Sequence, residues 1–428
     1  MSKKTVSICW FRRDLRINDN HALFKALNSG TPVLPIFIFD KNIIEELDAN
    51  DARITFIYEQ LNLLNKEFKK NNSGIYILID TPIKAWKKLV SEFIVKEVFY
   101  NEDYEPYAIG RDKEVHDFLS YKNIKSTACK DQVIFSGNEV LKADQTPYTI
   151  YTPYKNKWRE KLNTSLLKNY DSELGNSYVE NNYEIPTISE MGFTLSIKKV
   201  KPYNFNSLEN YENTRNIPSL NGTSNLSPHL RFGTVSIRQI VNEVKENESF
   251  LNELIWREFF MQILFHFPKV INANFKRKYD TVEWRNNEKE FELWKSGNTG
   301  YPMVDAGMRE LNATGYMHNR VRMIVAGFLC KHLLIDWRWG EAYFAEHLLD
   351  YELASNNGNW QWAAGTGCDS APYFRVFNPT TQLKKFDPEL IYIRKWIPEF
   401  DELNYSLPMV DHKMARERAI STYKRGIS

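Results

Sequence analysis

The sequence predicts an α/β domain with a parallel sheet, followed by a domain built only of helices. Three observations predict this arrangement. Short β-branched runs alternate with helix-like segments over about residues 1–130, whereas apolar residues recur at three and four spacing after Ser227. The chain of 428 residues is also too long for one ordinary hydrophobic core. We therefore expect an α/β domain over 1–130, a long interdomain linker over 131–204 and a helical domain over 205–428.

The first part of the chain alternates predicted strands with predicted helices. Continuous apolar strands in such an alternation indicate a parallel sheet covered by helices on both faces, so we predict a Rossmann-like domain. The predicted strands are TVSICWF, VLPIFIF, IYILID and KEVFY, and the predicted helices cover residues 21–30, 51–70, 83–93 and 110–121.

The turn after the first predicted strand reads WFRRDLRINDN. It lacks the GxGxxG pattern that brings a backbone turn against a pyrophosphate, so this domain is not predicted to be an ordinary dinucleotide binder. We expect Arg12, Arg13 and Arg16 to form a solvated, salt-bridged loop and not a phosphate site.

The pattern loosens between Asp131 and Leu220, where turns mix with aromatic residues. We expect this region to form a long linker that crosses the surface of both domains. Apolar residues then recur at helical spacing and predict the all-helical domain. The segments with this spacing are 235–244, 250–267, 307–336 and 341–349.

Composition and charge exclude several classes of protein. The formal net charge of +2 is nearly neutral, so a nucleic-acid partner would need a local basic patch. No secretory segment and no apolar run of membrane length is found, so we expect a cytoplasmic protein. No zinc or iron–sulfur ligand pattern is present, and no metal site is expected. The four cysteines, which have no CxxC spacing, are Cys9, Cys129, Cys330 and Cys368.

The stretch from Asp350 to Pro379 combines residues that are typical of a binding pocket. Trp360 and Trp362 lie in it among glycines, asparagines and acids. Glycine weakens helices and a buried indole N–H needs a partner, so a plain core would use aliphatic residues instead. The mixture suits a pocket for a flat, hydrogen-bonding molecule. The alternative is a helix–loop corner with an aromatic core.

The segment NGTSNLSPHLRFG places Thr223, Ser224 and Ser227 at the expected start of a helix. Small hydroxyl residues are ordinary N-caps. The same helix end offers free N–H donors to an anion, and three hydroxyl groups exceed what a cap needs. A diphosphate site is therefore the competing interpretation.

The predicted helix NELIWREFF carries charged residues on a face that a plain core would not use. Glu253, Trp256, Arg257 and Phe260 share this face at helical spacing. Because unpaired charges do not enter a core, the face lines either solvent or a polar cavity.

A second helix face carries Asn319, Arg322 and Met323 in HNRVRM. We expect Arg322 to pair with Asp350 or Glu352, because pairing would let both charges survive burial.

Together these blocks resemble the DNA photolyase/cryptochrome family, and most closely a class I photolyase that repairs cyclobutane pyrimidine dimers. The resemblance covers essentially the whole chain. It implies a U-shaped FAD in the helical domain and DNA containing pyrimidine dimers as the partner, and we expect a monomer. The blocks that carry it are, in order, WFRRDLRINDN, NGTSNLSPHLRFG, NELIWREFF, TGYPMVDAGMRE, MHNRVRM and LASNNGNWQWAAGTGCDSAPYFRVFNP.

The resemblance implies that FAD, active as the fully reduced anion, contacts two sets of residues. Asn356 matches the position that faces the central redox nitrogen of the flavin. The set around the isoalloxazine would be Arg257, Asn319, Arg322, Asp350, Glu352 and Asn356. The set around the phosphates and ribityl chain would be Tyr211, Thr223, Ser224, Leu226 and Ser227.

A pocket for the dimer is implied by the same resemblance. Trp256 and Trp362 would stack on the flipped-out bases, Glu253 would hydrogen-bond one base and Met323 would pack against it. The matched positions hold no histidine, which a 6-4 photolyase would be expected to show. The implied catalytic residues are Glu253, Asn319, Met323 and Asn356.

Three tryptophans match the chain that photoreduces oxidised flavin in this family, namely Trp360, Trp337 and Trp284. Without the resemblance, Trp337 and Trp284 would be read as core or interface residues.

The DNA phosphates would contact Arg215, Arg320 and Arg375 around the mouth of the cavity. Lys384 and Lys385 either join this patch or form an ordinary solvated pair.

Two positions depart from the family pattern. Glu352 stands where the family usually has Asp, so its contact with the flavin is open. Tyr107 and Ala108, in YEPYAIGRD, replace the Asn–Glu pair of the folate-binding antenna subgroup. We therefore do not expect a folate, and a deazaflavin, a second flavin or no antenna remain open.

Two other functions compete with repair. A cryptochrome-type blue-light photoreceptor without repair activity is the main alternative, but the sequence ends with DHKMARERAISTYKRGIS, and we expect none of the long tail of many such receptors. A flavoprotein electron carrier would need a nicotinamide site, and no such motif is visible. We expect light-driven DNA repair.

Overall fold

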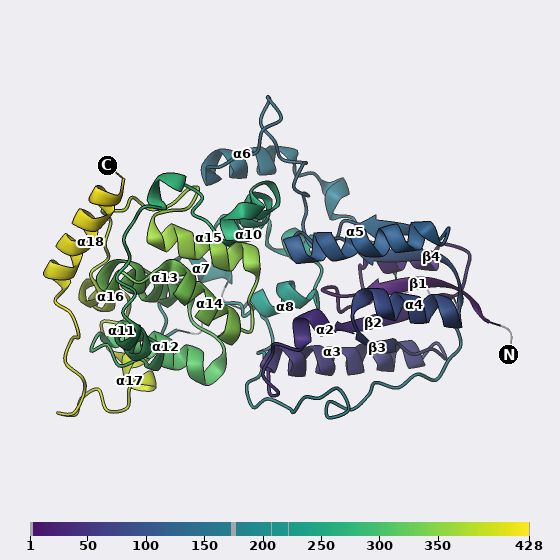
Figure 1. The fold of residues 1–428 in the computed structure, drawn as a ribbon, viewed down its shortest axis with the longest axis horizontal. Coiled ribbons are helices and arrows are strands. Elements are labelled where there is room, and N and C mark those ends of the chain that lie inside the picture. Colours follow the sequence, from purple (N-terminus) through teal and green to yellow (C-terminus); the bar gives the residue numbers. More distant parts are fainter. Residues whose placement is uncertain (1–2, 173–176, 207, 221, 428) are drawn as a thin grey trace. The chain divides into compact units, whose positions relative to one another are not determined.

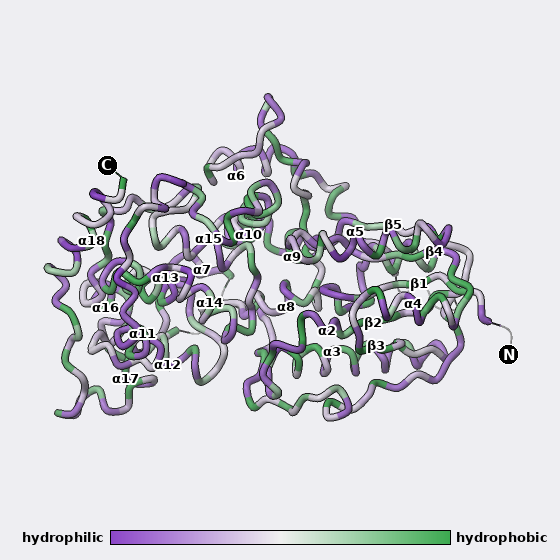
Figure 2. The backbone as a smooth tube through the Cα atoms, in the orientation of Figure 1, coloured by the Kyte–Doolittle hydropathy of each residue, from purple (hydrophilic) through white to green (hydrophobic). Residues whose placement is uncertain are grey.

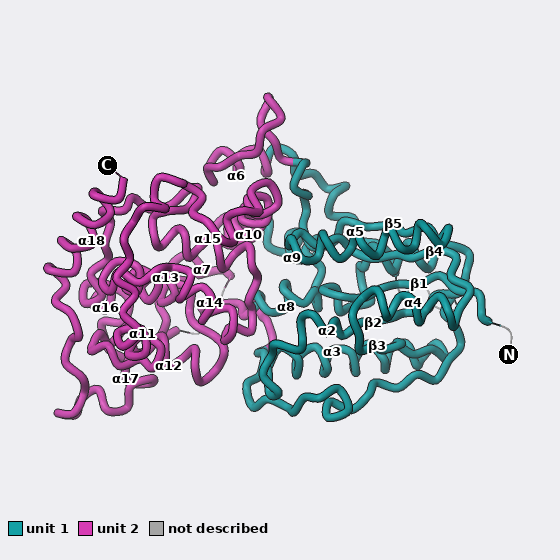
Figure 3. The backbone as a smooth tube through the Cα atoms, in the orientation of Figure 1, with its two compact units in different colours: residues 1–139, 160–201, 226–246 teal, residues 140–159, 202–225, 247–428 magenta. Residues whose placement is uncertain are grey.

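The computed structural model describes residues 3–172, 177–206, 208–220 and 222–427 of the chain (Figure 1). They form two compact units, drawn in teal and magenta in Figure 3. The prediction assigned each domain one continuous stretch of chain, with boundaries at 130 and 205. In the structure, each unit is instead made of three separate segments of the chain. Residues 173–176, part of the predicted linker, lie outside the described residues. Unit 1 comprises residues 1–139, 160–201 and 226–246, and unit 2 comprises residues 140–159, 202–225 and 247–428.

Unit 1 contains a five-stranded parallel sheet in the order β3-β2-β1-β4-β5. Every residue of β2 is buried, so both of its faces are covered, and its tube in Figure 2 is largely green. This is the predicted α/β domain with a Rossmann-like sheet. The strands are β1 (Thr5–Phe11), β2 (Val33–Asp40), β3 (Tyr76–Asp80), β4 (Ile94–Asn101) and β5 (Lys125–Cys129).

The helices that connect these strands lie where the alternation predicts them. Helix α5 begins earlier than expected, because Pro106 suits the first turn of a helix. Strand β5 was not predicted, since its sequence KSTAC has few apolar residues and it lies at the edge of the sheet. The helices are α1 (His21–Leu27), the short and unpredicted α2 (Lys41–Ile44), α3 (Ala52–Lys69), α4 (Pro82–Glu92) and α5 (Pro106–Tyr121).

The arginines that follow β1 are paired with acids. Arg12 contacts Asp112, and Nη2 of Arg16 lies 2.6 Å from Oδ2 of Asp131. Arg13 is likewise paired. The expected salt bridges are confirmed, but the prediction of a solvated loop is wrong. The Arg16 side chain is only 8% exposed, because its charge is neutralised where it lies.

Arg238 completes this ionic network within unit 1. It lies on α9 (Ile237–Val244), which follows α8 (Ser227–Phe232). Its Nε lies 3.0 Å from Oδ2 of Asp19, and its Nη2 lies 2.7 Å from Oδ1 of Asp131. Both carboxylate side chains are fully buried, so their charges depend on the arginines around them.

Unit 2 is helical, as predicted, and its largest core lies among α12, α13, α14 and α15. The periodic segment 307–336 is not one helix. Gly315, at φ 72°, ends α12, and a π-helical turn over Phe328–Leu333 follows α13. The helices are α7 (Tyr211–Thr214), α10 (Glu248–His266), α11 (Glu288–Ser296), α12 (Pro302–Thr314), α13 (Asn319–Gly327), α14 (Trp337–His347), α15 (Leu353–Ala364), α16 (Pro379–Phe386), α17 (Ile391–Trp396) and α18 (His412–Gly426).

The predicted linker contains a helix that was not predicted, α6 (Tyr151–Lys161), and its first turns pack on α10 within unit 2. Tyr154 packs on Phe259 with ring centroids 5.3 Å apart. Nε1 of Trp158 donates to Oε2 of Glu258 at 2.6 Å, which satisfies a buried carboxylate. This part of the linker is therefore anchored in the helical unit and does not merely cross a surface.

We expect Arg238→Met to lower the free energy of unfolding by about 3–5 kcal/mol, because it leaves two buried carboxylates without their shared cation. Urea denaturation measures the change. The matched control is Lys113→Met on α5, whose ion pair with Asp117 is exposed and should contribute at most about 1 kcal/mol. Equal losses in the two variants would contradict the assignment of the Arg238 network as a structural centre.

Candidate functional site

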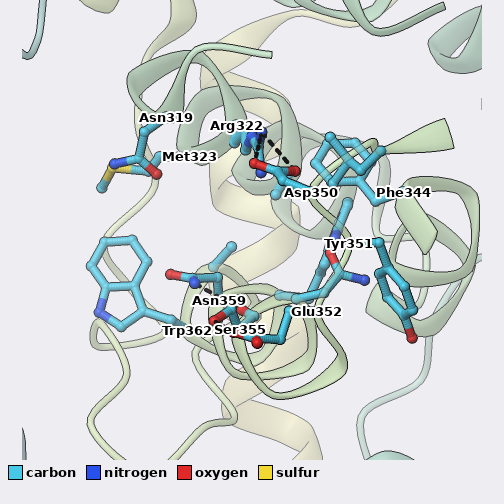
Figure 4. A pocket seen from close by; sticks show the side chains of 15 residues that line it. Asn319, Arg322, Met323, Phe344, Asp350, Tyr351, Glu352, Ser355, Asn359 and Trp362 are labelled. Carbon is cyan, nitrogen blue, oxygen red and sulfur yellow. Dashed lines mark hydrogen bonds and ion pairs between the residues drawn. The ribbon is translucent and has the colours of Figure 1, made fainter. Parts of the chain in front are cut away.

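A pocket in unit 2 gathers many of the residues expected around a flat ligand (Figure 4). Its cavity has a volume of about 90 Å³ and is partly open to solvent. Helices α13 and α15, with the segment between α14 and α15, supply most of the wall. The lining residues are Asn319, Arg322, Met323, Ala326, Phe344, Leu348, Asp350, Tyr351, Glu352, Ser355, Asn356, Asn359, Trp360, Trp362 and Ala363.

Arg322 and Asp350 form an ion pair in this wall. Nη2 of Arg322 lies 3.0 Å from Oδ2 of Asp350, and Nε of Arg322 donates to the carbonyl of Met317 at 2.7 Å. Burial alone would lower the pKa of Arg322, but the charge of Asp350 more than offsets this and the pKa is raised. The expected pairing of Arg322 is confirmed, with Asp350 as the partner.

Glu352 reaches from the start of α15 to α10. Its Oε1 lies 3.2 Å from Nη2 of Arg257, and Oγ of Ser355 donates to its Oε2 at 3.3 Å. The two charged side chains are almost fully buried, so each neutralises the other. The longer side chain of Glu relative to Asp spans the distance between the two helices.

Asn356 directs its amide group toward Glu341 of α14. Its Nδ2 donates to Oε1 of Glu341 at 2.9 Å and to the carbonyl of Glu341 at 3.1 Å. Burial raises the pKa of the Glu341 carboxyl, and the bond from Asn356 lowers it in part. Because the amide N–H groups are engaged, the acceptor Oδ1 is the atom that remains for a ligand. Glu341 was not predicted, since in the sequence it is an ordinary helix residue.

The charged face of α10 is paired and not simply solvated. Oε1 of Glu253 lies 2.6 Å from Nη2 of Arg215. Burial raises the pKa of Glu253, and Arg215 lowers it in part. Arg215, which was expected at a DNA phosphate, is therefore engaged with the acid expected at a damaged base.

Trp256 stacks on Tyr151, a residue that was not predicted. The ring centroids lie 3.6 Å apart and the planes are within 7° of parallel. The Tyr151 hydroxyl donates to the carbonyl of Asn252 at 2.9 Å, and its backbone N–H donates to Asp369 at 3.0 Å. The aromatic run YTIYTPYKNKW was the only signal for it in the sequence.

Asn319, Met323 and Trp362 lie at one end of the pocket in Figure 4, and Phe344 and Tyr351 lie at the other. Asn319 is exposed, whereas Met323 and Trp362 are half-buried. This end therefore offers a flat indole and a flexible thioether to a ligand that arrives from solvent.

The other cations expected at DNA phosphates differ in how far neighbouring residues orient their charged groups. Nη2 of Arg320 donates to Oδ1 of Asn216 at 2.6 Å, and its guanidinium lies 4.5 Å from the ring centroid of Phe386. Arg375 is exposed, as are Lys384 and Lys385 on α16. The structure thus orients Arg320 and leaves the charges of the others in contact with solvent.

The three tryptophans expected to carry electrons all lie in unit 2. Trp360 lines the pocket and packs edge-to-face on Phe344, with ring centroids 5.0 Å apart. Trp337, at the start of α14, is fully buried. Trp284 is half-buried and lines a second, polar cavity of about 270 Å³. They occupy the pocket wall, the core and a partly exposed position, respectively.

The residues expected at the FAD phosphates are divided between the two units. Oγ1 of Thr223 lies 3.5 Å from the hydroxyl of Tyr316, whose ring centroid lies 5.6 Å from the guanidinium of Arg322. These contacts bring Thr223 close to the pocket wall. Asn221, the first residue of this block, lies outside the described residues. The other members are Tyr211 and Ser224 of unit 2, and Leu226 and Ser227 at the start of α8 in unit 1.

His318 caps the helix that carries Asn319 and Arg322. Its Nδ1 accepts the backbone N–H of Arg320 at 3.1 Å, which requires that nitrogen to be unprotonated. Burial lowers the pKa of His318 to about 4, with the nearby arginines contributing in the same direction.

Among the described residues, no group of three or more His, Cys, Asp or Glu residues is placed to hold a metal ion. None of the helices in this part of the chain combines the length and apolarity needed to cross a membrane.

Two family models match the chain. Residues 7–171 match the model of DNA photolyase, and residues 250–404 match the model of the FAD binding domain of DNA photolyase. The second match contains every residue that lines the pocket.

Relatives of known activity align with nearly the whole chain. The deoxyribodipyrimidine photo-lyase of Escherichia coli is 35% identical, and the alignment covers 98% of each chain. The deoxyribodipyrimidine photo-lyase of a Synechococcus species is 32% identical over 97% of this chain and 96% of its own.

Solved structures share the fold of both units. A bacterial class III photolyase from Agrobacterium tumefaciens is 32% identical with a TM-score of 0.87, covering 100% of this chain and 98% of that one. An archaeal photolyase from Sulfolobus tokodaii, solved with two FAD molecules, is 32% identical with a TM-score of 0.83, covering 98% and 100%. The expected two-domain fold is confirmed. The class I subgroup is not, since one of these structures is a class III photolyase.

We expect the free energy of unfolding to fall as the pH drops from about 6.5 to about 4. The unfolded imidazole of His318 takes up a proton near pH 6.5, whereas the folded one has its pKa lowered to about 4. Stability is therefore full above pH 6.5, and up to about 3 kcal/mol is lost toward pH 4.

His318→Asn is the control, because it keeps an N-cap side chain and removes the titration. Urea unfolding at a series of pH values should show a smaller pH dependence in this variant than in the wild type. The same slope in both proteins would mean that His318 does not cause it.

Proposed function

The chain belongs to the DNA photolyase family, and on this premise we propose that it repairs cyclobutane pyrimidine dimers in DNA by light-driven electron transfer. The observation that carries the proposal is the pocket itself. It combines a half-buried Arg322–Asp350 pair and the amide of Asn356 with the open end at Met323 and Trp362. Such a pocket can hold a flat cofactor inside and a flat substrate at its mouth.

FAD fits the donor set of the pocket. The guanidinium of Arg322 favours a negatively charged ring system, and Oδ1 of Asn356 can accept an N–H from its redox nitrogen. When bound in its fully reduced, anionic form, FAD supplies a light-excited one-electron donor. The residues of unit 2 that would hold it are Arg257, Asn319, Arg322, Asp350, Glu352 and Asn356 around the ring, and Tyr211, Thr223 and Ser224 at the phosphates.

The residues at the mouth of the pocket would bind the flipped-out dimer. Trp362, which lines the pocket, and Trp256, which lies on α10 outside the lining and is held by Tyr151, would offer flat faces on which bases stack. Glu253 would exchange its contact with Arg215 for a hydrogen bond to a base, which frees Arg215 for a phosphate. Met323 and Asn319 would pack beside the dimer and exclude water from it.

The DNA backbone would be met by a local cluster of cations despite the small net charge. Arg320 and Arg375 are the main candidates, with Lys384 and Lys385 on the exposed side of α16. Binding through such contacts weakens as the salt concentration rises, because the phosphates take back their counterions.

A second chromophore in unit 1 is part of the proposal, and its identity remains open. The hydroxyl of Tyr107 donates to Asp40 at 2.5 Å and accepts from Nδ2 of Asn42 at 3.2 Å. The Tyr107 hydroxyl is therefore already engaged with Asp40, at the end of β2, and with Asn42. These contacts argue against a folate held by an Asn–Glu pair at this position. The two FAD molecules of the Sulfolobus tokodaii photolyase make a second flavin one candidate. We further propose a monomer that acts in the cytoplasm.

The proposed function is tested by light-dependent repair. Purified protein with fully reduced FAD is mixed with an oligonucleotide that carries one cyclobutane thymine dimer, illuminated with near-UV and blue light, and scored for restored thymines. A dark sample is the control. Restored thymines in the light alone are expected, and their absence would favour the photoreceptor alternative.

We expect Trp256→Ala to weaken binding of the dimer-containing oligonucleotide by about 5- to 150-fold, since stacking of a base on an aromatic ring contributes about 1–3 kcal/mol. Trp362→Ala should act in the same direction, and it tests the pocket independently of the fold of α10. Tyr121→Ala, which removes an aromatic ring that is 82% exposed in unit 1, is the control. Wild-type affinity in both tryptophan variants would rule out the proposal that the dimer stacks on Trp256 and Trp362.

Tyr151 is a positioning residue for Trp256, so Tyr151→Leu should raise the dissociation constant for damaged DNA by about two- to tenfold. Tyr151→Phe retains the stacked ring and should bind as the wild type does. The rate of repair at saturating DNA should be the same in both Tyr151 variants as in the wild type, because Tyr151 does not line the flavin pocket. A loss in the rate alone would place Tyr151 in another role.

A further inference from the structure

The buried indole of Trp337 donates its N–H to a neutral amide. Nε1 of Trp337 lies 2.9 Å from Oδ1 of Asn274, and both residues are buried, at 0% and 3% exposure. Asn274 lies between the short helices over Pro268–Ile271 and Arg277–Tyr279 and belongs to unit 2. Nothing in the sequence distinguishes this asparagine, and the function proposed above assigns it no part.

A carboxylate lies directly behind this amide. Nδ2 of Asn274 donates to Oδ1 of Asp280 at 2.9 Å, and Oδ2 of Asp280 lies 2.7 Å from Nε of Arg277. The amide orientation is fixed by its two neighbours, because a flipped amide would set N–H against N–H and oxygen against carboxylate. The nearest carboxylate in this chain of hydrogen bonds is thus separated from the indole N–H by one amide.

This separation matters when Trp337 loses an electron. An oxidised indole is a much stronger acid at its N–H than a neutral one. A carboxylate in hydrogen-bond contact would take that proton and leave a neutral radical that no longer passes its charge onward. An amide oxygen accepts a hydrogen bond but does not hold a proton near neutral pH.

We propose that Asn274 is a positioning residue that keeps the proton on Trp337 and so makes this tryptophan a relay and not a trap. The inference rests on the proposed function together with the tryptophan path that the family resemblance implies, in which light-excited oxidised flavin takes an electron from Trp360. Trp337 then reduces the oxidised Trp360, and Trp284 reduces the oxidised Trp337. No bond breaks at Trp337, and an external thiol supplies the electron that finally reduces Trp284.

The surroundings of Trp337 and Trp284 favour movement of the positive charge from Trp337 to Trp284. The guanidinium of Arg338 lies 5.0 Å from the ring centroid of Trp337, where it disfavours a second positive charge. Trp284 is half-buried and lines the polar cavity together with Asn274, Asp280 and Arg338. Positive charge is therefore better solvated on Trp284, and an external reductant can approach it there.

The test exchanges the two side chains by the double substitution Asn274→Asp with Asp280→Asn. The net charge and the hydrogen bond between the two positions are retained, but the carboxylate now contacts the indole N–H of Trp337. Protein with oxidised FAD is excited by a laser pulse, and transient absorption separates protonated from deprotonated tryptophan radicals. Continuous illumination with a thiol then measures the yield of reduced flavin.

We expect the exchanged protein to form a deprotonated radical early and to lose most of its photoreduction yield. Adding Trp337→Phe should remove this early radical, which locates it. Asp280→Asn alone is the matched control and should behave as the wild type, because Asn274 stays beside Trp337. Bound flavin content and thermal stability verify that each variant is folded.

Wild-type radicals and yield in the exchanged protein would overturn the inference. So would equal losses in the exchanged protein and in Asp280→Asn, which would trace the effect to Asp280. A wild-type protein that shows no photoreduction would overturn the inference together with the tryptophan path. Repair by chemically reduced protein does not use this path, so it tests the proposed function separately.

Discussion

The helical unit depends on two ion pairs in or beside one pocket. Arg322 pairs with Asp350 and Arg257 with Glu352, and of these four side chains only Arg322, at 25% exposure, is not almost fully buried. A charge that leaves solvent without a partner is costly, so the pairing is what lets these groups lie there. The pairs therefore tie α13 and α10 to the segment at the start of α15, and they give the pocket a polar wall.

Helix α10 links this wall to α6. Its Arg257 reaches Glu352, whereas the neighbouring Glu258 accepts the indole N–H of Trp158 on α6. Between these contacts, Trp256 is stacked against Tyr151. One face of the Trp256 ring is thus supported by the same packing that holds α6, and its other face is the one proposed to meet a substrate. Binding energy is then not spent on ordering the ring.

Sequence patterns predicted those elements whose burial is continuous. Strand β2 is buried along its whole length and was evident, whereas α6 buries only Tyr151, Tyr154 and Trp158, whose helical i, i+3, i+7 spacing is a weak signal among polar residues. Most of the predicted pocket residues came together because their motifs lie on the few helices that form its wall. The partners Glu341 and Asn274 could not be predicted. Their roles arise from contacts across 15 and 63 positions of the chain, which leave no local pattern.

Two amides in this unit occupy comparable positions. Asn356 presents Oδ1 toward the pocket because Glu341 holds its N–H groups, and Asn274 presents Oδ1 to Trp337 because Asp280 holds its Nδ2. In both cases a carboxylate fixes the amide, and under the proposals above the amide would keep that carboxylate from direct contact with a redox group. An amide orients an N–H without taking its proton. A protein that moves single electrons in light gains from this arrangement, since an electron that is not followed by a proton can still return.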